Sequence, residues 1–102
     1  MADTPYNSLN PQLANLFTNL EGQYNLPQGL LQAVAYTESR YNNKASSGAG
    51  AQGMFQFMPA TAKQYNVDVT DPVSSANVAA RMYADLLRAN GGDLNKALAG
   101  LS

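Results

Sequence analysis

Apolar positions recur every three or four residues in two segments of the N-terminal half, and this spacing predicts two helices. The first helix is expected to begin near Pro11, because Asn10 is a favourable N-cap and proline is favoured at the first helical position. Its apolar stripe consists of Leu13, Leu16, Phe17, Leu20 and Tyr24. The stretch "YNLPQG" breaks this helix, and a second is expected from about Pro27 to Arg40. The inner face of the second helix consists of Leu30, Leu31, Val34 and Ala35.

The C-terminal half predicts a loop and three more helices. Residues 42–53, "NNKASSGAGAQG", are rich in Gly, Ser and Asn, which favour turns over helices. A short helix is expected at 59–65 and a longer one at about 72–90, opened by Asp71–Pro72 and stopped by "GG". Asp93 can cap a fifth helix in "LNKALAGLS". The apolar face of the longer helix consists of Val73, Ala76, Ala80, Tyr83 and Leu87. No β-rich alternating run or repeat is visible, so the predicted fold is all-α, with about five helices.

The amino-acid composition excludes several kinds of partner and of catalytic group. The chain has 102 residues, which is one domain, and 45% of them are hydrophobic, which is enough for a core. Only 13% are charged, the formal net charge is −1 and no Lys/Arg cluster is present, which argues against nucleic acid or an anionic membrane surface as the main partner. The chain lacks Cys and His, which excludes disulfides, thiolate and His catalysis, and the common zinc sites. Acid–base chemistry must therefore come from carboxylates, Tyr or Lys.

Glu38 carries a charge where the helical spacing calls for an apolar residue, since it follows Val34 by four positions and Leu31 by seven. A carboxyl held against apolar walls is penalised in its charged form, and the C-terminal end of a helix disfavours negative charge as well. Such a group keeps its proton and can donate it to a leaving oxygen, as glycoside cleavage requires. The alternative is a solvated glutamate at a helix end, paired with Arg40 or Lys44.

Aromatic residues bracket Glu38 in the sequence, and Tyr41 and Phe57 are candidates for stacking on sugar rings, although packing in the core is the alternative. Gln56 lies between Phe55 and Phe57 and offers an amide donor and acceptor beside apolar walls. It could bind an N-acetyl group, or it could form a structural bond to the loop backbone.

The segment "TESRYNNKASSGAGAQGMFQFMPATAKQYNV" resembles the catalytic segment of the soluble lytic transglycosylase family. That family's pattern has Glu-Ser, an aromatic-Asn pair, a Ser/Gly loop, Gly-Ala-x-Gly, and a hydrophobic-Met-Gln-x-Met-Pro-x-Thr-Ala run. Here the pattern begins at Glu38-Ser39 and continues through "GAQG" to "MFQFMPATA", with no gap between Glu38 and Gln56. The broader likeness covers roughly residues 12–100. The resemblance implies a lysozyme-like fold.

The resemblance also implies roles for individual residues. Glu38 would be the sole general acid and then the base, and Ser47 matches a serine that contacts the substrate or the acid. Gln56 and Met58 match positions that line the groove near the acid, although packing is an alternative reading for Met58. The implied substrate is peptidoglycan, cleaved between N-acetylmuramic acid and N-acetylglucosamine with closure of a 1,6-anhydro ring. No metal or cofactor is implied.

The sequence departs from the family at its third motif. The family has Ala-Tyr-Asn there, whereas this chain reads "ALAGLS", with Leu101 and Ser102 where Tyr and Asn belong. We therefore expect residues 1–10 to be a polar leader and 11–102 to be a lysozyme-like transglycosylase domain that lacks its C-terminal part. A shortened groove exposes apolar surface, which favours self-association or a place within a larger virion or envelope protein.

Two alternatives to a lytic transglycosylase remain. One is a lysozyme-type hydrolase of the same bond; the other is a non-catalytic peptidoglycan-binding or virion structural module, because the third motif is absent. The chain shows no signal peptide and no run of transmembrane length, so no membrane insertion is expected. The stretch "VAYTESRY" resembles the lytic modules of bacteriophage virion proteins more than periplasmic enzymes. The expected place of action is the bacterial cell wall in the periplasm, reached from a virion or by export.

Overall fold

The computed structural model describes residues 9–99, with side chains described as far as residue 97. Within these residues the fold is all-α, as predicted, and two isolated β-bridges are its only extended pairings. Most of the expected polar leader lies outside the described residues, as do Leu101 and Ser102 of the third motif. The helices are α1 (Pro11–Tyr24), α2 (Leu30–Ser39), α3 (Pro59–Tyr65), α4 (Pro72–Ala89) and α5 (Leu94–Ala99). No helix of the described chain is both long and apolar enough to cross a membrane.

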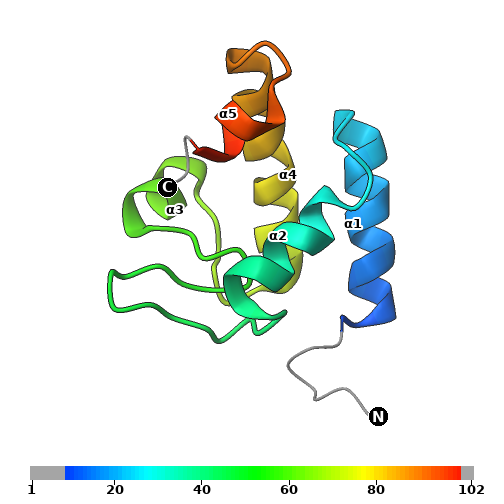
Figure 1. The fold of residues 1–102 in the computed structure, drawn as a ribbon. Coiled ribbons are helices and arrows are strands. Elements are labelled where there is room, and N and C mark those ends of the chain that lie inside the picture. The colour runs from blue at the N-terminus through cyan, green and yellow to red at the C-terminus, as the bar shows by residue number, and fades with distance from the viewer. Residues whose placement is uncertain (1–8, 100–102) are drawn as a thin grey trace.

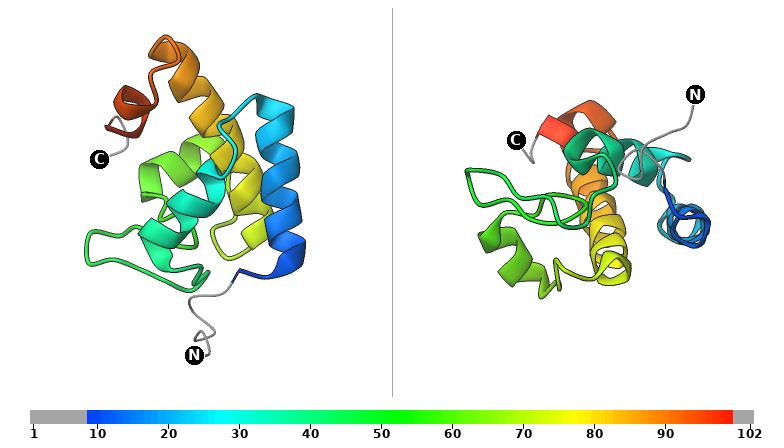
Figure 2. Two further views of the ribbon diagram at one scale, coloured as in Figure 1. Left: turned by 45° about the vertical axis from the view of Figure 1, so that its right-hand side comes forward. Right: turned by 90° about the horizontal axis from the view of Figure 1, so that it is seen from below.

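Helix α4 runs through the middle of the molecule, with α1 on one side and α3 and the long loop on the other (Figure 1; Figure 2). Helix α2 packs against both α1 and α4, and α5 returns onto the end of α4. The small side chains of Ala76, Ala79 and Ala80 are fully buried, which lets neighbouring elements approach α4 closely. The core consists of Phe17, Leu20, Leu26, Leu30, Leu31, Val34, Ala35, Met54, Phe55, Phe57, Ala76, Ala79, Ala80, Met82 and Tyr83.

The predicted capping residues are confirmed. Asn10 caps α1 through its side chain, which accepts a hydrogen bond from the backbone N–H of Gln12 at 2.7 Å. Asp71 caps α4 in the same way, by accepting from the N–H of Val73 at 2.9 Å. Both helices carry proline in the first turn, where its missing N–H costs nothing.

Helix α2 begins at Leu30, three residues later than predicted. Gly29 has φ +87°, which is outside the helical region and is readily adopted only by glycine, so residues 27–29 form a turn instead. No side chain of α2 itself caps its first turn. The cap comes from α1, where the buried Glu21 accepts a hydrogen bond from Gly29 N–H at Oε1 (2.9 Å) and one from Leu31 N–H at Oε2 (2.8 Å). One carboxylate thus joins two helices and satisfies two backbone donors.

The loop after α2 is held to the end of that helix by Ser39. Its hydroxyl lies 3.0 Å from the carbonyl oxygen of Ala35 and 2.7 Å from that of Met54. Further along, Gln52 and Phe57 exchange two backbone hydrogen bonds of 3.0 Å, which close a tight turn. Gly53 lies in that turn with φ +86°, and a Cβ at this position would be 2.6 Å from the carbonyl oxygen of Val69. The turn therefore strongly favours glycine at position 53.

We predict that Glu21→Ala lowers the free energy of unfolding by about 3 kcal/mol, because a buried backbone N–H group (Leu31) and a part-buried one (Gly29) lose a charged acceptor. Urea unfolding followed by circular dichroism measures the loss. Gln23→Ala in the same helix is the control, since Gln23 is exposed and should change stability by less than about 0.5 kcal/mol. Equal losses in the two variants would contradict the role given to Glu21.

We also predict that Gly53→Ala destabilises the protein by about 2 kcal/mol or more, since the left-handed backbone and the contact with Val69 both oppose a methyl group. Gly48→Ala is the matched control, because nothing lies within 4 Å of a Cβ there and no positive φ is required. Thermal unfolding of the two variants checks this, and a Gly53→Ala protein as stable as the control would refute the close approach.

Candidate active site

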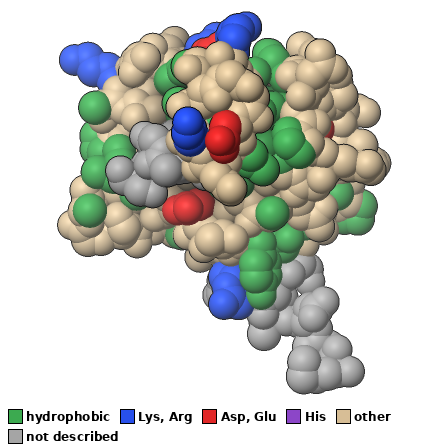
Figure 3. Space-filling view, turned by 45° about the horizontal axis from the view of Figure 1, so that its top comes forward, with side chains coloured by type: hydrophobic (Ala, Val, Ile, Leu, Met, Phe, Trp, Pro, Cys, Tyr) green, Lys and Arg blue, Asp and Glu red, His purple; other side chains and the backbone are tan. Residues whose placement is uncertain are grey.

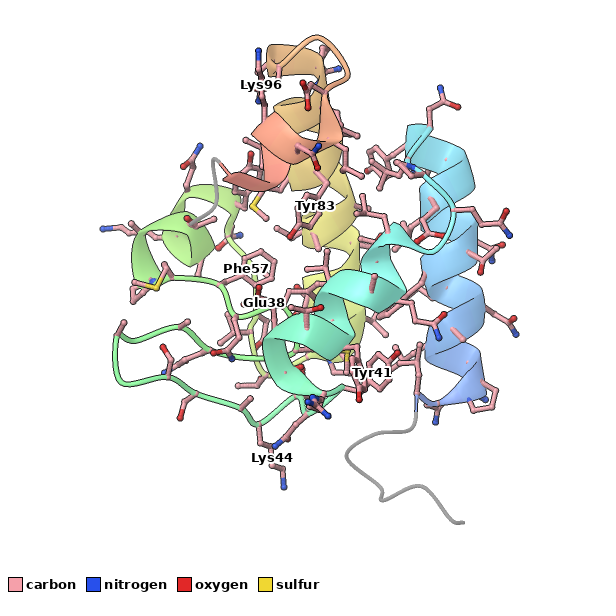
Figure 4. The ribbon with its side chains drawn as sticks, in the orientation of Figure 1. Glu38, Tyr41, Lys44, Phe57, Tyr83 and Lys96 are labelled. Atoms are coloured by element: carbon pink, nitrogen blue, oxygen red, sulfur yellow. The ribbon has the colours of Figure 1, made fainter. Side chains whose placement is uncertain are left out.

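Glu38 lies in the last turn of α2 and points toward α4 and the loop that follows α2 (Figure 4). Its side chain is exposed, so the prediction that this carboxyl is desolvated against apolar walls is wrong. The reason is that α2 ends one residue later, so Glu38 lies in the last turn of a helix that stops there. Glu21 is the buried glutamate of this chain, with a capping role. The alternative pairing of Glu38 with Arg40 or Lys44 is also absent, because the only ion pair among the described residues joins Asp85 and Arg88.

Two hollows open on either side of Glu38. The larger has a volume of about 700 Å³ and is lined by Pro27, Gln28, Gly29, Leu30, Ala33, Val34, Thr37, Glu38, Tyr83 and Leu94. The smaller has a volume of about 70 Å³ and is lined by Glu38, Phe55, Gln56, Phe57, Met58, Thr61, Met82 and Tyr83. Two residues, Glu38 and Tyr83, line both hollows. The acid therefore stands at the junction of two hollows, where a chain-like ligand could cross it.

Tyr83 reaches the same junction from α4 and faces Glu38 across it (Figure 4). Tyr83 is only 3% exposed, although it lines both hollows. Burial raises the pKa of the Tyr83 hydroxyl, and the charge of Glu38 raises it further. Tyr83 therefore keeps its proton at neutral pH and well above it.

Apart from Glu38, the described residues that line both hollows are uncharged, with no Lys, Arg or Asp among them. In Figure 3 the charged side chains are few and scattered among neutral and apolar ones. Among the described residues no group of three or more Asp or Glu side chains lies close enough to hold a metal ion. Neutral, partly apolar walls with single polar groups suit a carbohydrate better than an anion.

Gln56 lines the smaller hollow, and part of its amide is already hydrogen-bonded to the loop backbone. The sequence predicted this side chain as a ligand for an N-acetyl group. Its Nε2 donates to the carbonyl oxygens of Ala45 (3.0 Å) and Gly53 (2.8 Å), which uses both of its N–H bonds. Gln56 therefore forms the structural bonds to the loop backbone that were the alternative to binding an N-acetyl group. The backbone of Gln56 is left-handed, with φ 52°, and so turns the side chain back onto the loop. The acceptor Oε1 is the part of the amide left for a ligand.

Phe57 and Met58 also line the smaller hollow, at different depths. Phe57 is 3% exposed and packs against Phe55 with 6.3 Å between ring centroids. It is therefore a core residue that also lines the hollow. Met58 is 42% exposed at the rim. The two adjacent residues therefore form the floor and the edge of one wall.

Ser47 and Tyr41, the other two predicted substrate contacts, do not line either hollow. The Ser47 hydroxyl accepts a hydrogen bond from Ala51 N–H at 3.0 Å and so closes a turn in the loop. Tyr41 packs against the core and against Tyr36, with 5.3 Å between ring centroids, on another side of α2 from Glu38 (Figure 4). The structure thus brings Glu38, Gln56, Phe57 and Met58 together and leaves Ser47 and Tyr41 apart.

Sequence reasoning missed two residues of this site. Tyr83 was assigned only to the apolar face of its helix, yet it is the one residue of that face with a titratable group, and that was an available signal. Ser39 is part of the Glu-Ser motif, which by itself predicts no role for the serine, whereas the structure shows that it joins the helix that bears Glu38 to the loop that bears Gln56. No spacing in the sequence connects Ser39 with Met54.

Comparison with known proteins gives relatives of one kind. The chain is 42% identical over 77 residues to "Transglycosylase" of Enterobacteria phage PRD1, a match that covers 74% of this chain and 29% of that protein. It is 42% identical over 79 residues to "Peptidoglycan transglycosylase gp16" of Escherichia phage T7, covering 69% of this chain and 6% of the relative. It is 39% identical over 77 residues to "Membrane-bound lytic murein transglycosylase F" of Alteromonas mediterranea, covering 74% and 16%.

The chain thus spans less than a third of the length of each of these relatives. No solved structure gives a significant match. The family model described as "Transglycosylase SLT domain" matches residues 15–100, which include both hollows and every predicted site residue. This match confirms the resemblance seen in the sequence, and the chain belongs to the family of transglycosylase SLT domains.

Proposed function

We propose that this chain is a peptidoglycan lytic transglycosylase that cleaves the β-1,4 bond between N-acetylmuramic acid and N-acetylglucosamine, with Glu38 as its single acid and base. The observation that carries the proposal is that, within the described part of the chain, Glu38 is the one carboxylate lining the two hollows, at their junction. The family supports it, and so do relatives whose names specify peptidoglycan or murein.

In the first proposed step Glu38 donates its proton to the glycosidic oxygen, and the bond from that oxygen to C1 of the muramic acid breaks. The carbonyl oxygen of the sugar's own 2-acetamido group bonds to C1 and takes up the positive charge. In the second step the Glu38 carboxylate removes the proton from the 6-hydroxyl of the same sugar. The 6-oxygen then bonds to C1, the acetamido group is released, and Glu38 has regained its proton.

The positions of the nearby carboxylates favour this lyase over a hydrolase. A hydrolase that inverts needs a second carboxylate to activate water. Asp68 instead accepts hydrogen bonds from the hydroxyl (2.6 Å) and the backbone N–H (3.0 Å) of Thr70, which lower the pKa of its carboxyl. Asp71 caps α4, and neither aspartate lines a hollow. The sugar's own hydroxyl is therefore the proposed nucleophile.

We propose that Gln56, Phe57 and Met58 contact the glycan in the smaller hollow. With both N–H bonds of its amide occupied, Gln56 would accept through Oε1 from the N–H of an N-acetyl group. Ser47 would act through the shape of its loop, and Tyr41 by holding the end of α2 against the core.

The proposed setting is the bacterial cell wall. Relatives from two phages support a virion-associated protein that reaches the periplasmic wall, and the relative from Alteromonas mediterranea keeps a bacterial enzyme open. We further propose that residues 11–102 form the catalytic domain, and that its partners are glycan strands and either a second copy or a larger virion or envelope protein.

We predict that Glu38→Gln abolishes release of soluble fragments from purified peptidoglycan, with a loss of at least about 100-fold, because the amide can neither give nor take the proton. Asp68→Asn is the matched control, an acid-to-amide change outside the hollows, and should retain activity. Mass spectrometry of the products should find 1,6-anhydro-muramic ends.

Each other outcome identifies another function. Reducing ends, with activity lost in Asp68→Asn, would mean a lysozyme-type hydrolase. Binding to peptidoglycan without any release would mean a glycan-binding module. Full activity in Glu38→Gln would overturn the assignment of the acid.

A further inference from the structure

Glu38 and Tyr83 are complementary groups that face one junction without a partner. Among the described residues the Glu38 carboxyl takes part in no hydrogen bond and no ion pair. The Tyr83 hydroxyl likewise has no hydrogen-bond partner among them, and Tyr83 lines both hollows. By contrast, the hydroxyls of Tyr36 and Tyr65 are paired, with Arg40 and Asp85 respectively.

The two groups differ in how firmly they are held. Tyr83 is 3% exposed on the central helix α4, where its ring is part of the core, so the position of its hydroxyl is fixed. Glu38 is exposed at the end of α2 and can turn about its side-chain bonds. A general acid that must meet the glycosidic oxygen gains from a fixed group that sets its orientation.

Among the described residues, no other charged side chain lines the junction, and α5 contributes only the apolar Leu94. Helix α2 contributes Thr37, the loop contributes Gln56 and α3 contributes Thr61, all uncharged. On α4 the charged groups nearest to Tyr83 in sequence turn elsewhere. Arg81 lies over the ring of Tyr65, 5.1 Å from its centroid, and Asp85 accepts from the hydroxyl of Tyr65 and pairs with Arg88.

We propose that Tyr83 is a positioning residue for Glu38: when glycan fills both hollows and expels water, the Tyr83 hydroxyl donates a hydrogen bond to the Glu38 carboxylate. This rests on the proposed function, since it assigns Glu38 as the acid. Because burial raises the pKa of Tyr83, the O–H remains a donor throughout the reaction. The bond stabilises the carboxylate left by the first proton transfer and aims it at the next one.

The sign of the pH effect follows from this bond. A donor that stabilises the carboxylate makes it easier for Glu38 to lose its proton. Without the donor the carboxyl keeps its proton to higher pH, so the alkaline limb of the activity profile, where the acid is lost, moves upward. A purely structural tyrosine would lower activity at every pH and leave that limb in place.

Tyr83→Phe keeps the ring in the core and removes the donor. We expect kcat on peptidoglycan to fall about 10- to 100-fold, the effect of losing one charge-assisted hydrogen bond, with KM nearly unchanged. The alkaline limb should move to higher pH. Tyr65→Phe is the matched control, because its hydroxyl contacts Asp85 and lines neither hollow. Its kcat and its pH profile should match the wild type.

A second measurement needs no turnover. The chain has two glutamates, so a sample labelled with ¹³C-glutamate gives two carboxyl signals, and Glu21 is an internal reference. The titration is followed with and without a tetramer of N-acetylglucosamine. In Tyr83→Phe the Glu38 signal should titrate at higher pH than in the wild type. Replacing Tyr83 with 3-fluorotyrosine, a stronger donor of the same shape, should move it to lower pH.

The results separate the two proposals. Unchanged Glu38 titration in both Tyr83 variants, with and without the tetramer, would overturn the role of Tyr83 whatever the activity. A Glu38→Gln protein that still cleaves would overturn the proposed function, while the titration would still report on the hydrogen bond. Loss of activity in Tyr83→Phe at every pH, with the titration unmoved, would mean a structural tyrosine.

Discussion

The buried carboxylate of Glu21 is the contact on which the placement of the site depends. It accepts the N–H groups of Gly29 and Leu31 and so fixes where α2 begins and how it meets α1. A buried carboxylate without partners, or a helix end without a cap, would cost several kcal/mol of stability. The contact between α1 and the first turn of α2 is therefore held in one geometry. Since α2 is only ten residues long, fixing its first turn also fixes its last, where Glu38 lies.

From that helix the site is extended by backbone contacts that leave little freedom. The hydrogen bond from the Ser39 hydroxyl to the carbonyl oxygen of Met54 fixes the loop to the end of α2. The two backbone hydrogen bonds between Gln52 and Phe57 then fix the turn that contains Gln56. The opposite wall comes from α4, whose row of buried alanines lets α1 and α2 pack closely and leaves Tyr83 as the long side chain that reaches the junction. The result is a movable acid between two fixed walls.

Much of the fold could be predicted because its signals are local. Asn10, Asp71 and the prolines after them mark helix starts wherever they occur, and the spacing of apolar residues marks the faces. The start of α2 could not be predicted, because its cap comes from Glu21, eight residues before Gly29. The predicted burial of Glu38 is wrong for the same kind of reason. Helical spacing tells which face a residue occupies, whereas burial depends on what packs there.

The residues predicted for the site lie together where they are neighbours in the sequence, and the fold adds residues that are distant in the sequence. Gln56, Phe57 and Met58 follow one another and line one hollow with Glu38. Tyr83 could be recognised only once α4 was placed across from α2.

In the proposed function a glycan crosses Glu38 between the two hollows. A crystal structure of Glu38→Gln with an intact strand of alternating N-acetylglucosamine and N-acetylmuramic acid tests it most directly. Sugars should fill both hollows, with a glycosidic oxygen about 3 Å from the side chain of residue 38. A strand bound elsewhere, or one whose glycosidic oxygens all lie out of reach of that side chain, would contradict the account.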